Sequence, residues 1–183
     1  MKDMKNAFEE YFKKLINFSK QTYGAKPTVT FTNGLNKELL VSKSNEEGEV
    51  EWLPQLQNIA LPWNEIEGKV GFMISKELRE YYTTFLFLNL SGKYGGVYLY
   101  FQPLSSQEEI LRTIFRQYSD AQSVFPHSKT FLIGSANYYN DDGYHIFYDN
   151  SDLKTFCYES DTKKEILLSY SLAEVISTME AFE

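Results

Sequence analysis

The chain has 183 residues, with 18 Lys and Arg against 25 Asp and Glu, and it is 43% hydrophobic with 14 Tyr, 14 Phe and 2 Trp. Its richness in aromatic residues excludes a disordered chain, and this length can bury one core without a disulfide or a structural metal. A formal net charge of −7 disfavours direct nucleic-acid binding, and the single Cys excludes an intramolecular disulfide. We therefore expect one cytoplasmic domain over residues 1–183, with no signal peptide, no membrane span and no cofactor.

The first part of the chain predicts a helix followed by a hairpin region. Apolar residues recur at the spacing of one helical face: Phe8, Tyr11, Phe12, Leu15 and Ile16. Gly24 and Pro27 end this pattern. Short β-prone runs at 28–31, 38–41 and 49–53 then alternate with turn-prone residues, which is typical of short antiparallel strands.

The middle of the chain predicts two helices around a hairpin. The hydroxyl of Ser75 can cap a helix that ends near Thr84, with Glu77 close to its positive end. Residues 85–102 form two β-rich runs separated by turn-prone residues 91–96. A capping box, Ser105 with Glu108 or Ser106 with Glu109, opens the next helix, whose inner face carries Ile110, Leu111, Ile114, Phe115 and Tyr118.

The last third predicts strands and a closing helix. The strands fall at 130–134, 145–149 and 155–159, with a weaker candidate at 165–169, and residues 140–143 supply a turn. Ser171 and Glu174 form another capping box, followed by an inner helical face of Leu172, Val175, Ile176, Met179 and Phe182. The whole order predicts an α+β fold: a mostly antiparallel sheet of about six strands with helices packed on one face.

Enzyme signatures are sparse. Two His and one Cys cannot supply a metal site with several ligands of these types, and the glycines at 92–96 lack the spacing of a phosphate-binding loop. Cys157 and His145, on neighbouring predicted strands, are the nucleophile pair of an enzymatic alternative, which requires a thiol of low pKa. A purely structural subunit that forms a constitutive homo-oligomer is a further alternative. We expect a protein that is not an enzyme.

Acidic and aromatic residues suggest a binding surface. Residues 44–68 contain six acids and no base, and residues 130–153 contain a second group of acids without a base. Such groups form solvated acidic faces, docking surfaces for a basic protein or, in glycosidases, acid catalysts. The predicted partner-binding residues are Glu47, Glu49, Glu51, Trp52, Trp63, Glu65, Glu67, Asp141 and Asp142.

Several short runs resemble a known family. The run YYTTF at 81–85, continued through YGG at 94–96 to Gln102, resembles the central helix-to-hairpin segment of the Syd (SecY-interacting protein) family in the SUKH superfamily. Further similar runs are EWLP at 51–54, FP at 125–126, TFLI at 130–133 and LAE at 172–174. Their shared order over almost the whole chain carries the resemblance.

The resemblance implies an α+β fold without catalytic machinery and a concave acidic face that binds a basic protein. In the Syd branch that partner is the cytoplasmic side of SecY, which would make this protein peripheral to the inner membrane. Across the wider superfamily, the alternative is an immunity protein that binds and neutralises a bacterial nuclease toxin. The Lys-rich first helix and residues 138–142 depart from the Syd pattern, so both partners stay open.

Overall fold

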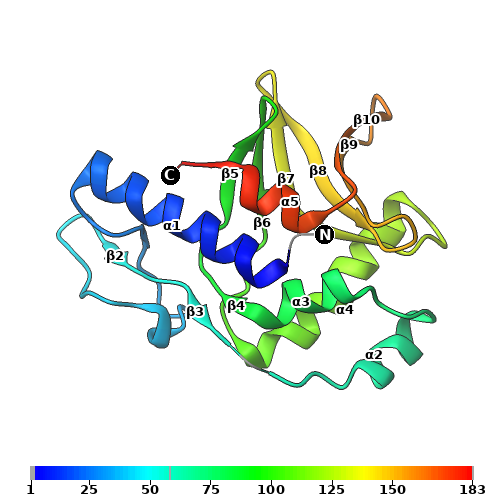
Figure 1. Ribbon diagram of the computed structural model, residues 1–183, viewed down its shortest axis with the longest axis horizontal. Helices are drawn as coiled ribbons and strands as arrows, with labels where there is room; N and C mark the ends of the chain where they lie inside the picture. Colours follow the sequence, from blue (N-terminus) through cyan, green and yellow to red (C-terminus); the bar gives the residue numbers. More distant parts are fainter. Residues whose placement is uncertain (1–2, 58, 183) are drawn as a thin grey trace.

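The computed structural model describes residues 3–57 and 59–182. Its helices are α1 (Met4–Tyr23), the 3₁₀ helix η1 (Lys37–Leu39), α2 (Trp63–Val70), α3 (Lys76–Thr84), α4 (Gln107–Val124) and α5 (Leu172–Thr178) (Figure 1). None of the helices in this described part is both long and apolar enough to cross a bilayer.

The strands form one large sheet and two small ones. The large sheet is antiparallel, curls into a half-barrel and has the order β10-β9-β8-β7-β6-β5-β11. Its strands are β5 (Ser91–Tyr94), β6 (Val97–Phe101), β7 (Thr130–Tyr138), β8 (Asp141–Asp149), β9 (Lys154–Glu159), β10 (Lys164–Ser169) and β11 (Glu180–Ala181). The small sheets pair β1 (Thr28–Thr30) with β2 (Glu49–Glu51) and β3 (Gln55–Leu56) with β4 (Phe85–Leu86). The predicted fold class, α+β with helices packed on an antiparallel sheet, is confirmed.

Most of the helical packing lies on one face of the sheet. Helix α1 contacts α3, α5 and β11, and the main hydrophobic core includes its apolar face together with Phe101 and Ile146 from the sheet. The end of α4 packs on the opposite face, where Phe125 contacts Phe147 and Phe156. Phe147 follows Ile146 and Phe156 precedes Cys157, and both of these neighbours belong to the main core. Because successive side chains of a strand point to opposite faces, the two phenylalanine rings lie on the other face of the sheet.

Two of the predicted helix starts have the expected caps. The Ser75 Oγ accepts a hydrogen bond from the Leu78 amide at 3.2 Å, and the Ser171 Oγ accepts one from the Glu174 amide at 3.2 Å. Helix α4 begins as predicted, but its N-cap Ser106 makes no side-chain capping bond, so neither predicted capping box forms there.

The last helix is shorter than predicted. It ends at Thr178, so Met179 and Phe182 lie beyond it, and β11 pairs Glu180 with Lys93. Gly92 permits this pairing, because a Cβ at this position would lie 2.8 Å from the Glu180 carbonyl oxygen. The chain end therefore completes the sheet edge.

The two turns predicted at residues 91–96 and 140–143 are shorter than expected. Gly95 and Gly96, with φ of +54° and +89°, connect β5 to β6, while Tyr139 and Asn140, with φ of +50° and +63°, connect β7 to β8. Two successive positive φ angles produce the two-residue turn that matches the twist of antiparallel strands. Ser91–Tyr94 and residues 141–143 consequently belong to strands.

Two further segments correct the predictions. Residues 38–41 do not form a strand: the Asn36 side chain accepts the Glu38 amide at 3.0 Å and starts η1, and only Leu40 bridges to Trp52. Helix α2 was not predicted, and two of its residues, Glu65 and Glu67, were predicted only as members of the acidic run 44–68. It ends at Gly71, which has a φ of +87°.

Candidate functional site

The predicted partner-binding residues do not form one groove. Glu47, Glu49, Glu51 and Trp52 lie on or beside β2, Trp63, Glu65 and Glu67 lie on α2, and Asp141 and Asp142 begin β8. In Figure 1, β2 is at the left, α2 at the lower right and the β7–β8 hairpin at the top. The prediction of one acidic concave surface built from these nine residues is therefore wrong.

Two of these residues do line a common hollow. Glu47 and Glu49 face a hollow of about 590 Å³, which we call the β1 hollow. Its other lining residues are Tyr23, Ala25, Thr28, Val29, Thr30, Asn45 and Asn89. The Asn45 side chain accepts the amides of Glu47 at 3.0 Å and Glu49 at 2.8 Å, which holds the loop before β2 in place. None of the described lining residues is Lys or Arg.

Glu51 and Trp52 have structural roles. Glu51 is opposite Thr28 on the same strand face as Glu49, and its Oε1 accepts the Lys26 amide at 3.3 Å. Trp52 is completely buried and packs edge-on against Phe12, with ring centroids 6.5 Å apart. Trp52 belongs to the core, so the prediction that it contacts a partner is wrong.

Two of the three α2 residues, Trp63 and Glu67, contact Arg79 of α3. The Glu67 carboxylate accepts the Ile74 amide at 2.6 Å and forms an ion pair with the Arg79 guanidinium. The same guanidinium lies over the half-buried Trp63 ring, 5.3 Å from its centroid. Glu67 is thus neutralised within the fold, which contradicts its predicted role as an unpaired docking charge. Glu65 is exposed and has no ion pair with any described residue.

The β8 aspartates are exposed at a hairpin tip. Asp141 accepts the Gly143 amide at 3.0 Å, which stabilises the start of β8. Asp142 is exposed beside it. These carboxylates lie on a projecting hairpin, away from the glutamates of β2 and of α2 (Figure 1).

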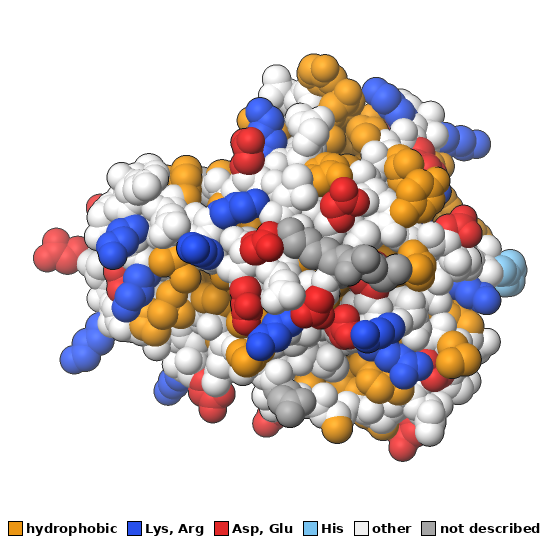
Figure 2. Space-filling model, viewed as in Figure 1, with side chains coloured by type: hydrophobic (Ala, Val, Ile, Leu, Met, Phe, Trp, Pro, Cys, Tyr) orange, Lys and Arg blue, Asp and Glu red, His pale blue; other side chains and the backbone are white. Residues whose placement is uncertain are grey.

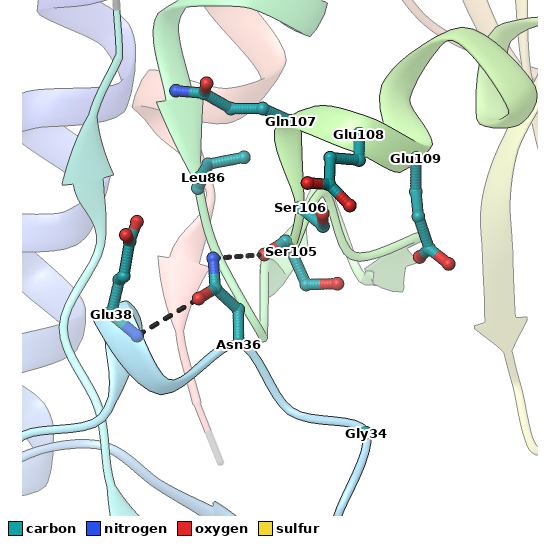
Figure 3. Close-up of a pocket in the computed structure, with 9 residues that line it drawn as sticks. All are labelled: Gly34, Asn36, Glu38, Leu86, Ser105, Ser106, Gln107, Glu108 and Glu109. Carbon is teal, nitrogen blue, oxygen red and sulfur yellow. Dashed lines mark hydrogen bonds between the residues drawn. The ribbon is translucent and has the colours of Figure 1, made fainter.

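A second acidic hollow was not predicted. It lies between residues 34–38, β4 and the start of α4, has a volume of about 440 Å³, and we call it the α4 hollow (Figure 3). It is lined by Gly34, Asn36, Glu38, Leu86, Ser105, Ser106, Gln107, Glu108 and Glu109. Figure 3 shows Glu38 on one side and Glu108 and Glu109 on the other. Lys37 precedes Glu38 in the chain but does not line the hollow.

One hydrogen bond joins the two sides of the α4 hollow. The Asn36 side chain donates to the Ser105 carbonyl oxygen at 3.0 Å while its own Oδ1 accepts the Glu38 amide. The segment around η1 and the start of α4, about seventy residues apart, are thereby fixed to each other. Within the described part of the chain, the Glu38, Glu108 and Glu109 carboxylates have no basic partner.

The α4 hollow was missed because its residues had other local interpretations. Glu108 and Glu109 matched capping boxes, and Glu38 lay in a predicted strand. Because no capping box forms, both α4 glutamates remain available to the hollow. No local pattern links Glu38 to them; the signal available was the surplus of acids itself.

The Cys157–His145 pair of the enzymatic alternative does not form. Strands β8 and β9 pair His145 with Tyr158 and Ile146 with Cys157, so the imidazole and the thiol point to opposite faces of the sheet. Cys157 is completely buried, whereas His145 is exposed and lines a polar hollow of about 760 Å³ with Asp120 and Ser135. Burial raises the pKa of the Cys157 thiol to about 12.

We expect Cys157 to react with iodoacetamide at neutral pH about a hundredfold more slowly in the folded protein than in urea, because only an accessible thiolate is nucleophilic. Mass spectrometry after timed quenching measures the reaction, and the urea-unfolded chain is the control. Since the chain has 1 Cys, a single adduct reports this site. Equal rates in the two states would contradict the burial and restore a reactive thiol.

No group of three His, Cys, Asp or Glu side chains that could hold a metal ion is found among residues 3–57 and 59–182. The two acidic hollows present glutamate carboxylates, which accept hydrogen bonds and attract cations such as lysine and arginine side chains.

No protein-family model matches this chain, and no curated protein matches its sequence. The resemblance to Syd stays a prediction that rests on the quoted runs, and the functional argument depends on the geometry of the hollows.

Proposed function

We propose that this protein is a non-enzymatic, Syd-like binding module that docks a basic protein, and that its partner is the cytoplasmic face of SecY. One observation carries the proposal: the α4 hollow and the β1 hollow are lined by five glutamates, and no lysine or arginine among the described residues lines either of them. Two hollows with unpaired carboxylates suit the insertion of cationic side chains from a partner.

The position of the hollows supports a common docking region. Residues 28–49 contribute to both, through β1 and the loop before β2 in one and through Asn36 and Glu38 in the other. The internal hydrogen bonds of Asn36 and Asn45 hold the backbone that carries these glutamates. A preorganised acidic surface speeds the association with a basic partner more than it raises the final affinity.

The test compares two triple variants that remove the same charge. Glu38→Gln, Glu108→Gln and Glu109→Gln together neutralise the α4 hollow, whereas Asp120→Asn, Asp152→Asn and Asp161→Asn neutralise exposed aspartates elsewhere. We expect the first variant to lower the association rate with SecY in nanodiscs about tenfold at low ionic strength, because local charges steer the encounter. At high ionic strength the difference should shrink through screening. Biolayer interferometry measures both rates.

The control variant separates local from overall charge. It should change the association rate by less than about threefold, because its aspartates are outside the two acidic hollows. If the two triple variants behave alike, or if SecY does not bind at low ionic strength, the proposed partner and surface are wrong. Glu47→Gln with Glu49→Gln tests the β1 hollow in the same way.

A nuclease toxin is the second candidate partner. A nuclease must present a basic face to bind the phosphate backbone of its substrate, and such a face would also suit the glutamate-lined hollows. Inhibition of a bacterial nuclease toxin, lost in the α4-hollow triple variant, together with no binding to SecY, would favour the immunity role.

A further inference from the structure

A groove on the exposed side of α1 differs from both acidic hollows. It has a volume of about 330 Å³ and is lined by Glu9, Phe12, Lys13, Ile16, Asn17 and Phe85; we call it the α1 groove. Phe12 and Phe85 are only 3% and 7% exposed and form its apolar floor. Ile16 is half-buried at its side.

The apolar surface continues beyond the groove. Leu56 of β3 is paired with Phe85 of β4 and is 54% exposed. Figure 2 shows a hydrophobic area between the positions of α1 and β3, with basic side chains along α1 beside it. A continuous apolar patch with a charged border is typical of an interaction site.

The α1 side chains are spaced to receive a helix. Residues 9, 13 and 17 form one row along α1, and residues 12, 16 and 20 form the next, each with a spacing of four residues. Helices pack by placing such a row of one helix into the furrow between two rows of the other. The α1 groove is therefore shaped for an amphipathic helix that inserts a bulky apolar side chain over Phe12 and Phe85.

The charges beside the α1 groove favour an acidic partner. Glu9 is paired with Lys5 at 3.6 Å, so its charge is compensated. Lys13 and Lys20 are exposed and have no acidic partner among the described residues. The border thus carries a local positive charge in a chain whose net charge is −7.

We propose that the α1 groove binds an acidic amphipathic helix of a partner protein. The helix places one large apolar residue between Phe12, Ile16 and Phe85. Its carboxylates face Lys13, which lines the groove, and Lys20, which lies further along α1. This surface has the opposite charge preference from the two glutamate-lined hollows, so it is a second site and does not depend on the docking of a basic protein.

Two designed peptides of about 18 residues test the proposal. Both carry leucine at the positions of one helical face; the remaining positions are glutamate in one peptide and lysine in the other. We expect the Leu/Glu peptide to bind more tightly than the Leu/Lys peptide when titrated against the folded protein, with fluorescence anisotropy as the readout. The net charge of −7 would by itself favour the Leu/Lys peptide, so tighter binding of the Leu/Glu peptide must come from the local charge of the groove border.

Two variants locate the binding. Ile16→Asp should weaken binding of the Leu/Glu peptide about tenfold or more, because it places a charge in the apolar contact. Leu167→Asp makes the same kind of change at a 47% exposed residue on β10 and should leave the affinity unchanged. Lys13→Glu should weaken the binding about fivefold by reversing one border charge. Unfolding curves establish that each variant is folded.

The proposal is overturned if neither peptide binds, if the Leu/Lys peptide binds as tightly as the Leu/Glu peptide, or if Ile16→Asp and Leu167→Asp have equal effects. The triple variant of the α4 hollow should bind the Leu/Glu peptide as the unmodified protein does, since its residues are outside the α1 groove. Failure of this proposal is thereby distinguished from failure of SecY docking.

Discussion

Phe8→Ala should lower the free energy of unfolding by about 4 kcal/mol, because it removes a large side chain from a core that can collapse only in part. Phe8 is completely buried on α1. Its ring centroid lies 5.7 Å from Phe12, 5.9 Å from Tyr81, 5.7 Å from Phe85 and 5.8 Å from Phe87. The residue therefore joins α1 to α3 and to the segment that begins at β4. Urea unfolding followed by far-ultraviolet circular dichroism measures the loss.

Phe18→Ala is the matched control on the same helix. Phe18 is half-buried, and the ring contact found for it is with the exposed Tyr23, at 6.3 Å. We expect this change to cost about 1 kcal/mol, since little apolar surface is exposed by it. Equal costs for the two substitutions, or a cost below about 2 kcal/mol for Phe8→Ala, would contradict the packing described for α1.

Features with a local cause were predictable. Phe8, Tyr11, Phe12 and Leu15 repeat with the period of a helix, and all are buried in α1. Ser75 stands before α3 and caps it, because a serine hydroxyl competes well for the first free amides. The β-rich runs after residue 130 were found because their period and composition differ from those of helices.

Features that depend on contacts between distant segments were not predictable. Residues 38–41 have the composition of a strand, yet the Asn36 side chain starts η1 and also bonds Ser105. The acids of α2 matched a solvated acidic face, but Arg79, twelve residues after Glu67, pairs with the Glu67 carboxylate. Trp52 is an exception, because its local signal existed: Glu49 and Glu51 lie on one strand face, so alternation places Trp52 with Val50 on the other face, which is buried.

The same limit applies to the acidic surface. A surplus of glutamates predicted uncompensated negative charge, and Glu47 and Glu49 do line a hollow in which none of the described lining residues is Lys or Arg. The composition could not say that Glu38 lines the same hollow as Glu108 and Glu109, because their approach depends on the hydrogen bond from Asn36 to Ser105. The basic α1, which was read as a departure from the Syd pattern, borders an apolar groove of its own.

Glu77 illustrates a residue whose local interpretation missed its main role. It was expected to interact with the positive end of its own helix, α3. Its Oε1 instead accepts the Ser171 hydroxyl at 2.8 Å and the Ala173 amide at 3.0 Å, at the start of α5. Its Oε2 accepts the Tyr148 hydroxyl of β8 at 3.3 Å. One carboxylate, 8% exposed as a residue, thus joins α3, α5 and the sheet.

Glu77→Ala should therefore lower the free energy of unfolding by about 3 kcal/mol, because it leaves the buried Ala173 amide and the Ser171 hydroxyl without their acceptor and leaves the Tyr148 hydroxyl with only the Ser75 Oγ, at 2.9 Å. Glu77→Gln keeps one acceptor oxygen and should cost about half as much. The measurement is urea unfolding at neutral pH, with the slope against urea unchanged. Glu80→Ala, on the same helix, is the control: it removes an exposed pair with Lys76 at 3.4 Å and should cost about 0.5 kcal/mol. If Glu77→Ala costs no more than Glu80→Ala, the carboxylate does not hold these three elements together.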